Sequence, residues 1–133
     1  MIDRTFVVID ALRLRGIGPQ IHQFYQKDTL RELNKAYIGF KGDRMEEESK
    51  SGKKSVTTGR WGCGAYNGHP ELKFALQWIA SSAHNREMTF STFKENDCKF
   101  LSDIIAKYEG KPISQLYTDL LKLRNHVAKL VKF

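Results

Sequence analysis

Four glycines between residues 59 and 68 constrain this chain more than any other feature. Gly59, Gly62, Gly64 and Gly68 lie between residues 55–58, which predict a strand, and a helix that Pro70 suits as a first residue. Glycine allows positive φ and lets backbone N–H groups approach a ligand. The following helix N-terminus adds orphan N–H donors and a partial positive charge. The run predicts a cradle for phosphate or diphosphate, with a simple tight turn as the alternative.

Common phosphate-binding motifs do not account for this run. No Gly-Lys-Ser/Thr follows it, and its glycines lack the GxGxxG spacing of dinucleotide-binding folds. Trp61 and Tyr66 flank it, and an aromatic ring beside a phosphate site can pack on a ribose or base. Both rings can instead pack inward, which is the favoured interpretation for Trp61. Cys63 is interpreted as small and structural, because the sequence places no histidine to activate its thiol.

The apolar pattern along the chain predicts an α/β fold of alternating strands and helices. Thr5–Ile9 is a nearly continuous apolar run, which predicts a strand buried on both faces. A later strand is predicted over Glu87–Phe93, and the charged stretch Lys41–Lys54 predicts a loop. A first helix is predicted over residues 29–37, with Asp28 as N-cap and Gly39 as the end. A second helix is predicted to begin at Pro70 and to be buried on more than one side. Two further helices are predicted along Cys98–Tyr108 and Ile113–Leu130.

Length and charge limit the organisation and the partners. The 133 residues indicate one domain, residues 1–133, without a membrane span or a secretory signal. A net charge of +7 favours polyanionic partners, although such an excess is common on soluble domains. The basic C-terminal helix could serve a nucleic acid or a protein partner, but docking on the sheet is favoured. The spacing of cysteines and histidines argues against zinc and disulfides and favours a reducing compartment.

Three ordered motifs resemble one known family. Thr58-Gly-Arg-Trp-Gly-Cys-Gly-Ala-Tyr66 looks like the Thr-Gly-Asn-Trp-Gly-Cys-Gly-Ala-Phe signature of poly(ADP-ribose) glycohydrolases. Val8–Leu12 and Arg31–Tyr37, closed by Gly39-Phe40, are similar to two further blocks in the same order, and Thr89–Phe93 is similar to the strand after the helix. The resemblance implies a macrodomain-like three-layer α/β/α fold, present in part as the C-terminal portion of the catalytic domain.

The resemblance also implies an activity and a set of site residues. The family binds ADP-ribose and hydrolyses ribose–ribose bonds in poly(ADP-ribose). In this chain residues 62–65 would hold the diphosphate, and Tyr66 would take the place of a phenylalanine beneath the terminal ribose. The implied substrate-binding residues are Arg60, Trp61, Gly62, Cys63, Gly64, Ala65 and Tyr66.

The acid of the family has no counterpart here. It is the second of two glutamates that follow a glutamine, downstream of a glycine triplet. Glu46-Glu47-Glu48 follow Met45 instead, and are interpreted as a solvated charge run. We therefore expect no catalytic residue in this chain and no activity from it alone. The alternative is a non-catalytic module that binds ADP-ribose or poly(ADP-ribose).

Three residues depart from the family pattern around the cradle. Arg60 replaces an asparagine, Asn67 a glycine and His69 an aspartate, and histidine is the poorer N-cap. Arg60 would add a charged contact to the diphosphate or obstruct the pocket. The resemblance implies no cofactor and no metal. It implies poly(ADP-ribose), ADP-ribose and poly(ADP-ribosyl)ated proteins as partners, without a membrane or direct DNA contact, in the DNA damage response of the nucleus or cytoplasm.

Overall fold

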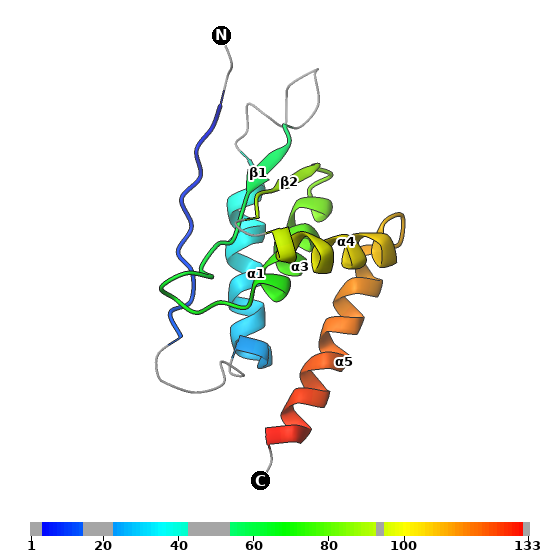
Figure 1. Cartoon of the computed structure of the whole chain (residues 1–133). Helices are drawn as coiled ribbons and strands as arrows, with labels where there is room; N and C mark the ends of the chain where they lie inside the picture. The colour runs from blue at the N-terminus through cyan, green and yellow to red at the C-terminus, as the bar shows by residue number, and fades with distance from the viewer. Residues whose placement is uncertain (1–3, 15–22, 43–53, 93–94, 132–133) are drawn as a thin grey trace.

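A short parallel sheet of two strands and four helices around it make up the regular structure in the described part of the chain. The computed structural model describes residues 4–14, 23–42, 54–92 and 95–131. The elements are α1 (Gln26–Phe40), β1 (Val56–Thr58), α3 (Pro70–Ala83), β2 (Met88–Phe90), α4 (Glu95–Tyr108) and α5 (Ile113–Val131). The two strands pair in parallel, with Val56 opposite Met88 and Thr58 opposite Phe90. Because α3 is the connection between them, β1, α3 and β2 form one βαβ unit (Figure 1).

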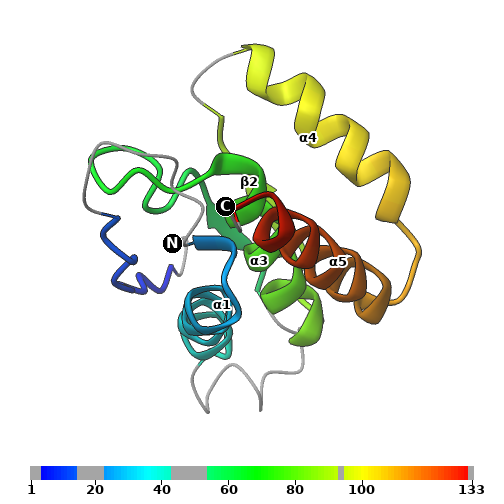
Figure 2. The same ribbon diagram turned by 90° about the horizontal axis from the view of Figure 1, so that it is seen from below.

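Helix α3 is the centre of the packing. It lies between α1 and α4 in both views (Figures 1 and 2). Ala80 packs with Ala36 and Phe40 of α1, whereas Ile79 packs with Leu116 of α5. Phe74 turns toward β2, where its ring meets that of Phe90 edge to face. The prediction of a helix buried on more than one side is therefore confirmed.

Helix α1 is longer at both ends than the sequence predicted. It begins at Gln26 after Tyr25, which has the extended backbone of an N-cap, so the prediction of Asp28 as N-cap is wrong. Asp28 lies in the first turn, where its charge favours the helix dipole. Gly39 lies inside the helix rather than at its end. A Cβ at Gly39 would lie 2.7 Å from Ile9 Cγ2, so this glycine serves the close approach of the N-terminal segment.

The N-terminal segment, residues 4–14, contradicts the prediction of a strand buried on both faces. It forms neither strand nor helix, and Phe6 and Val8 are 87% and 96% exposed. Val7 and Ile9 lie against α1 at Gly39. The backbone of residues 5–8 forms no hydrogen bond to another residue in the part of the chain described. A strand is buried on both faces only inside a sheet, and the two described strands pair with each other instead.

The remaining predictions are met in part. β1 confirms a strand within residues 55–58, and β2 is shorter than the predicted Glu87–Phe93, whose last residue lies outside the described ranges. Residues 43–53, including Glu46–Glu48, also lie outside them. Helix α5 begins at Ile113 as predicted, but its first turns dock on α3 through Leu116 and not on the sheet. None of the described helices has the length and apolar character needed to cross a membrane.

Candidate functional site

The glycine loop, residues 59–69, follows β1 and folds back on itself. The amide of Gly68 donates to the carbonyl of Gly62 at 2.8 Å, and that of Asn67 to Gly64 at 3.0 Å. Two of its residues have positive φ, 72° at Gly62 and 61° at Asn67. Asparagine is among the few residues other than glycine that adopt this conformation readily. Asn67 therefore fits a position at which the family signature has glycine.

Several amides of this loop point to a binding role. The N–H groups of Gly62, Gly64, Ala65 and Tyr66 donate to no other group among the described residues. The last three are consecutive and exposed, with Tyr66 41% exposed. Successive backbone N–H groups in a tight loop form concave sites for anions. The predicted cradle thus has free donors at Gly64–Tyr66.

The glycines differ in what the fold requires of them. A Cβ on Gly62 would lie 2.6 Å from the Ala11 Cβ, and one on Gly68 would lie 2.7 Å from the Gly62 carbonyl oxygen. Both positions must therefore stay without a side chain. A Cβ on Gly64 would meet nothing within 4 Å. The lack of a side chain at Gly64 serves no packing in the described residues and leaves the free amides open to a ligand.

The glycine loop lies at the carboxyl ends of the two parallel strands. A small cavity of about 170 Å³ lies there, lined by residues that include Arg60, His69, Phe90 and Thr92. Ligands of open α/β sheets bind at this edge of the sheet. His69 caps α3, because its Nδ1 accepts from the amide of Leu72 at 3.4 Å. The histidine thus performs the capping role in which it replaces an aspartate.

Trp61 packs inward from the loop. Its ring lies against the cluster of Ala36, Phe40 and Ala80, and its Nε1 donates to the carbonyl of Ile9 at 3.2 Å. Cys63 lies beside it, and its Sγ is 3.6 Å from the Trp61 carbonyl oxygen. The structure therefore separates the predicted site residues into two groups. Gly64, Ala65 and Tyr66 face solvent, whereas Trp61 anchors the loop to α1 and the N-terminal segment.

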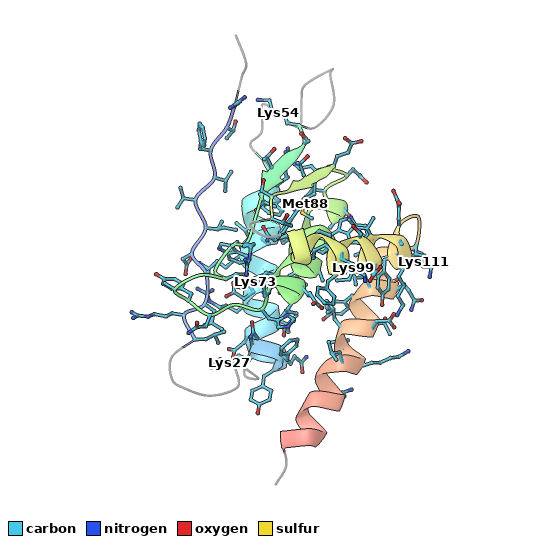
Figure 3. All side chains as sticks on the ribbon, in the orientation of Figure 1. Lys27, Lys54, Lys73, Met88, Lys99 and Lys111 are labelled. Atoms are coloured by element: carbon cyan, nitrogen blue, oxygen red, sulfur yellow. The ribbon has the colours of Figure 1, made fainter. Side chains whose placement is uncertain are left out.

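Two buried polar residues of α3 and α1 support the loop from below and were not predicted as site residues. Lys73, which is labelled in Figure 3, and Glu32 are each 2% exposed. The Lys73 Nζ lies 3.0 Å from Glu32 Oε1. Nζ also lies 4.2 Å from the centre of the Trp61 ring. Burial lowers the pKa of Lys73, and the Glu32 carboxylate opposes that shift. The available signal was the position of Lys73 between Leu72 and Phe74 on a helix predicted to be buried on several sides.

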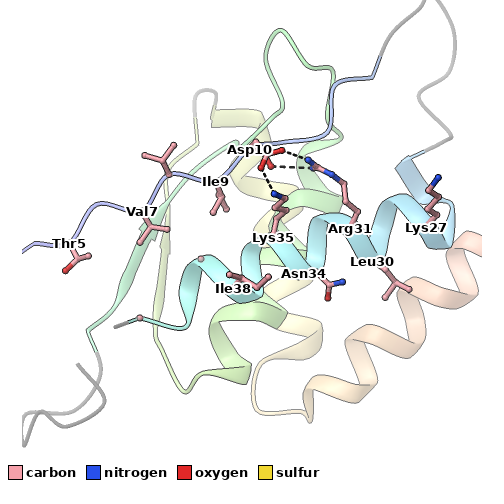
Figure 4. Close-up of a pocket in the computed structure, with 13 residues that line it drawn as sticks. Thr5, Val7, Ile9, Asp10, Lys27, Leu30, Arg31, Asn34, Lys35 and Ile38 are labelled. Atoms are coloured by element: carbon pink, nitrogen blue, oxygen red, sulfur yellow. Dashed lines mark hydrogen bonds and ion pairs between the residues drawn. The ribbon is translucent and has the colours of Figure 1, made fainter. Parts of the chain in front are cut away.

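A larger groove runs between the N-terminal segment and α1. It has a volume of about 920 Å³ and is lined by Val7, Ile9 and a polar row on α1 (Figure 4). Asp10 of the N-terminal segment forms ion pairs with two residues of this row, with Lys35 at 2.6 Å and with Arg31. The hydrogen bond from Lys35, reinforced by Arg31, holds the pKa of Asp10 below its usual value. No residue of the glycine loop lines this groove, so it is separate from the cradle.

Metal ligation has no support in the part of the chain that the structure describes. No group of three or more His, Cys, Asp or Glu residues lies together there in a way that could hold a metal ion.

Comparison with known proteins identifies the family. A sequence model described as poly(ADP-ribose) glycohydrolase (PARG), macro domain fold, matches residues 2–100. The chain belongs to the poly(ADP-ribose) glycohydrolase family. The fold class is accordingly that of a macro domain, and the described sheet and helices are part of its α/β architecture. The last 33 residues, which include all of α5 and the second half of α4, lie beyond the family match.

Relatives in the poly(ADP-ribose) glycohydrolase family are much longer than this chain. It is 37% identical over 91 residues to poly(ADP-ribose) glycohydrolase 1 of Caenorhabditis elegans, covering 67% of this chain and 11% of the relative. It is 36% identical over 93 residues to poly(ADP-ribose) glycohydrolase 2 of the same organism, covering 68% and 18%. Probable poly(ADP-ribose) glycohydrolase 2 of Arabidopsis thaliana is 45% identical over 60 residues, which cover 44% and 11%. The chain thus spans less than a fifth of these relatives.

Proposed function

We propose that this chain supplies the diphosphate- and ribose-binding part of a glycosidase that hydrolyses ribose–ribose bonds in poly(ADP-ribose). The observation that carries the proposal is the row of free amides at Gly64, Ala65 and Tyr66, in the loop that connects the end of β1 to the start of α3. Backbone N–H groups near a helix N-terminus bind phosphate without a cationic side chain. Membership of the family makes ADP-ribose the ligand to test first.

The reaction needs groups in addition to this cradle. Hydrolysis breaks the bond between the anomeric carbon of one ribose and the oxygen that links it to the next. A carboxylic acid protonates that leaving oxygen, and water adds to the anomeric carbon. In this proposal the diphosphate lies on the free amides, Arg60 adds a charged contact, and the exposed Tyr66 ring packs beneath the ribose.

The acid is proposed to come from another segment. No Gln-Glu-Glu sequence occurs in the chain. Without a positioned acid the protonation step loses a contribution of about 10²–10⁴-fold. Residues 1–133 alone are therefore proposed to be inactive, and the activity to need a segment that carries the glycine triplet and the glutamate pair.

The alternative proposal is a module that binds ADP-ribose without hydrolysing it. This alternative is favoured by the sequence, which has no Gln-Glu-Glu segment and so no counterpart of the acid of the family. The cavity of about 170 Å³ at Arg60 and His69 is smaller than the pockets of roughly 300–1,000 Å³ that enclose small ligands, so in either proposal it would hold only part of ADP-ribose. Both proposals require binding, and they differ in whether a second segment restores turnover.

One experiment tests both proposals. Calorimetry with ADP-ribose measures binding by the chain, and chromatography of products from poly(ADP-ribose) measures turnover with and without a fragment that carries the Gln-Glu-Glu segment. Release of ADP-ribose only with the fragment supports the enzyme, and binding without release supports the module. A chain that binds no ADP-ribose contradicts both. If the isolated chain is active and a Glu46, Glu47, Glu48 triple-alanine variant is not, the loop carboxylates are catalytic.

Partners and location follow as part of the same proposal. Poly(ADP-ribose) and poly(ADP-ribosyl)ated proteins are the proposed partners, in the DNA damage response of the nucleus or the cytoplasm, without membrane or direct DNA contact. Microscopy of the tagged chain before and after DNA damage tests the location, and binding assays with free poly(ADP-ribose) and with DNA test the selectivity.

A further inference from the structure

The buried pair of Lys73 and Glu32 has no part in the chemistry described above. Lys73 lies in the first turn of α3 and Glu32 in the middle of α1, and both side chains are almost completely excluded from solvent. Their charged atoms lie 3.0 Å apart. The ammonium group also lies over the face of Trp61, the ring that anchors the glycine loop. The pair therefore connects two helices at a point directly behind the loop.

Lys73 fills the space beneath the two ends of the loop. A Cβ on Gly62 would lie 3.4 Å from Lys73 Nζ, and one on Gly68 would lie 3.0 Å from Lys73 Cε. Gly62 and Gly68 are also the residues whose backbone hydrogen bond closes the loop. The closed conformation of the loop thus rests on the lysine side chain. Nζ is the end of that side chain that lies nearest Gly62.

Glu32 holds the opposite side of the loop indirectly. Its Oε1 accepts the amide of Leu12 and lies 3.3 Å from Arg31 Nη1. Two residues further along the N-terminal segment, the amide of Leu14 donates to the carbonyl of Tyr66 at 3.2 Å. The carboxylate therefore orders the segment on which the exposed end of the cradle rests. The pair supports the loop from beneath and from one side.

Stability alone does not explain a charged pair at this position. Removing two charges from water is costly, and apolar residues of similar volume often give equal or greater stability. The pair is also incompletely satisfied, because the buried Glu32 Oε2 accepts no hydrogen bond from the described residues. Burial of Lys73 further disfavours its charged form. A role that needs the charge itself is therefore the better explanation.

We propose that Lys73 and Glu32 are positioning residues for the anion cradle. They hold the glycine loop in the conformation in which the amides of Gly64–Tyr66 stay free and converge on a diphosphate. The ammonium group, nearer the loop than the carboxylate is, contributes positive potential to its backbone from below. Neither side chain touches the ligand, because both are buried beneath the loop. The ligand named here rests on the proposed function.

The test separates the charge of the pair from its volume. In the double variant Lys73→Met/Glu32→Gln, both charges are lost, the side chains keep similar length, and an amide oxygen remains for Leu12. Lys99→Met/Glu109→Gln makes the same chemical changes at exposed residues and serves as control. Lys73→Arg keeps the charge. Circular dichroism checks that each variant is folded.

Two readouts decide the outcome. In hydrogen exchange, the hydrogen-bonded amides of Asn67 and Gly68 should exchange about tenfold faster in the charge-free double variant, because the loop that they close opens more often, while the amides of α3 are unchanged. In calorimetry, the affinity for ADP-ribose should fall by about tenfold or more, whereas Lys73→Arg and the control retain it. If the pair has only a structural role, the order of the affinities is reversed: the double variant Lys73→Met/Glu32→Gln, which keeps the side-chain volumes, then binds at least as well as Lys73→Arg, which has the bulkier side chain.

The two proposals can fail separately. If the unaltered chain does not bind ADP-ribose, the proposed function is wrong, and the exchange of the Asn67 and Gly68 amides still decides whether the pair positions the loop. If the chain binds and the double variant matches it in affinity and in exchange, the positioning role is wrong. If the double variant does not fold, the single variant Glu32→Gln, which keeps Lys73, takes its place under the same two criteria.

Discussion

The side-chain amide of Gln77 donates to the backbone carbonyl of Gly59 at 3.1 Å, at the point where the chain leaves β1. The hydroxyl of Thr58 donates to the other end of the same amide at 2.5 Å. Gln77 is completely buried in α3. One side chain of the central helix therefore fixes the direction in which the glycine loop leaves the sheet.

Replacing Gln77 with methionine should destabilise the fold. The volume of the side chain is retained, but the Gly59 carbonyl and the Thr58 hydroxyl lose their buried partner. Leaving a buried polar group unsatisfied costs about 1–3 kcal/mol. Urea denaturation measures the free energy of unfolding, with Gln26→Met at the exposed start of α1 as control. Equal stability of the two variants would show that Gln77 does not hold the strand end.

Gly64→Val should abolish binding of ADP-ribose without loss of stability. The new side chain meets no atom of the described residues, because even its Cβ would have nothing within 4 Å. It would instead occupy the approach to the free amides. Calorimetry should show an affinity at least roughly tenfold weaker, since charge-assisted hydrogen bonds contribute about 1.5–3 kcal/mol.

The matched variant Gly62→Val should lose stability instead. It places a side chain at a residue with φ of 72° whose Cβ would clash with Ala11. If a folded Gly64→Val protein binds ADP-ribose with undiminished affinity, the assignment of the glycine loop as a phosphate cradle is wrong.

Asn67 offers a test of backbone strain. Its φ of 61° lies in the left-handed region, where a side chain without a local polar group costs roughly 1–2 kcal/mol. Asn67→Gly should change the free energy of unfolding by no more than about a few tenths of a kcal/mol, whereas Asn67→Val should lower it by about 1–2 kcal/mol. Thermal unfolding measures both. Equal melting temperatures for glycine and valine would contradict the left-handed conformation.

The pair of Tyr108 and Asp119 should make the α4–α5 packing depend on pH. The Tyr108 hydroxyl donates to Asp119 Oδ2 at 2.6 Å. That bond lowers the pKa of Asp119, and burial, helped by Asp119, raises the pKa of Tyr108. The contribution of Asp119 to stability is complete above the ordinary pKa of aspartate, and it is lost as the pH falls through the lowered pKa of Asp119. The contribution of Tyr108 to stability is complete below the ordinary pKa of tyrosine, and it is lost as the pH rises through the raised pKa of Tyr108.

Melting temperatures across acid and alkaline pH check this prediction. The variant Tyr108→Phe keeps the ring and removes the bond, so its melting temperature should fall at neutral pH and change less at either extreme. Exchange of α4 amides locates the effect. A pH profile identical to that of the unaltered chain would exclude the pair as its source.

Sequence reasoning found the parts of the fold that depend on local pattern. The strand–loop–helix order around the glycine loop, the start of α3 at Pro70 and the start of α5 at Ile113 all follow from turn residues and apolar spacing. The failures came where distant contacts decide. Gly39 was interpreted as a helix end because glycine often ends helices, whereas it makes room for Ile9, which lies 30 positions away in the chain.

The candidate site shows the same division. The motif located the residues at which the free amides lie, because glycines at close spacing mark a loop that a ligand can approach. It did not separate Gly64 from Gly62, since that distinction depends on Ala11 and on the sign of φ. Lys73 and Glu32 were not predicted as site residues, because a charged residue in a helix is ordinarily exposed to solvent. Only the packing of α3 against α1 makes them buried.

The βαβ unit has a consequence for how this chain unfolds. A parallel pair of strands cannot form as a local hairpin, so the pairing of β1 with β2 depends on the crossover through α3, which connects them along the chain. Because α3 also carries contacts to α1 and α5, opening of α3 disrupts most of the described core at once. Its amides should therefore exchange only through global unfolding. The amides of residues 5–8, which have no partner among the described residues, should exchange at nearly the rate of an unstructured peptide.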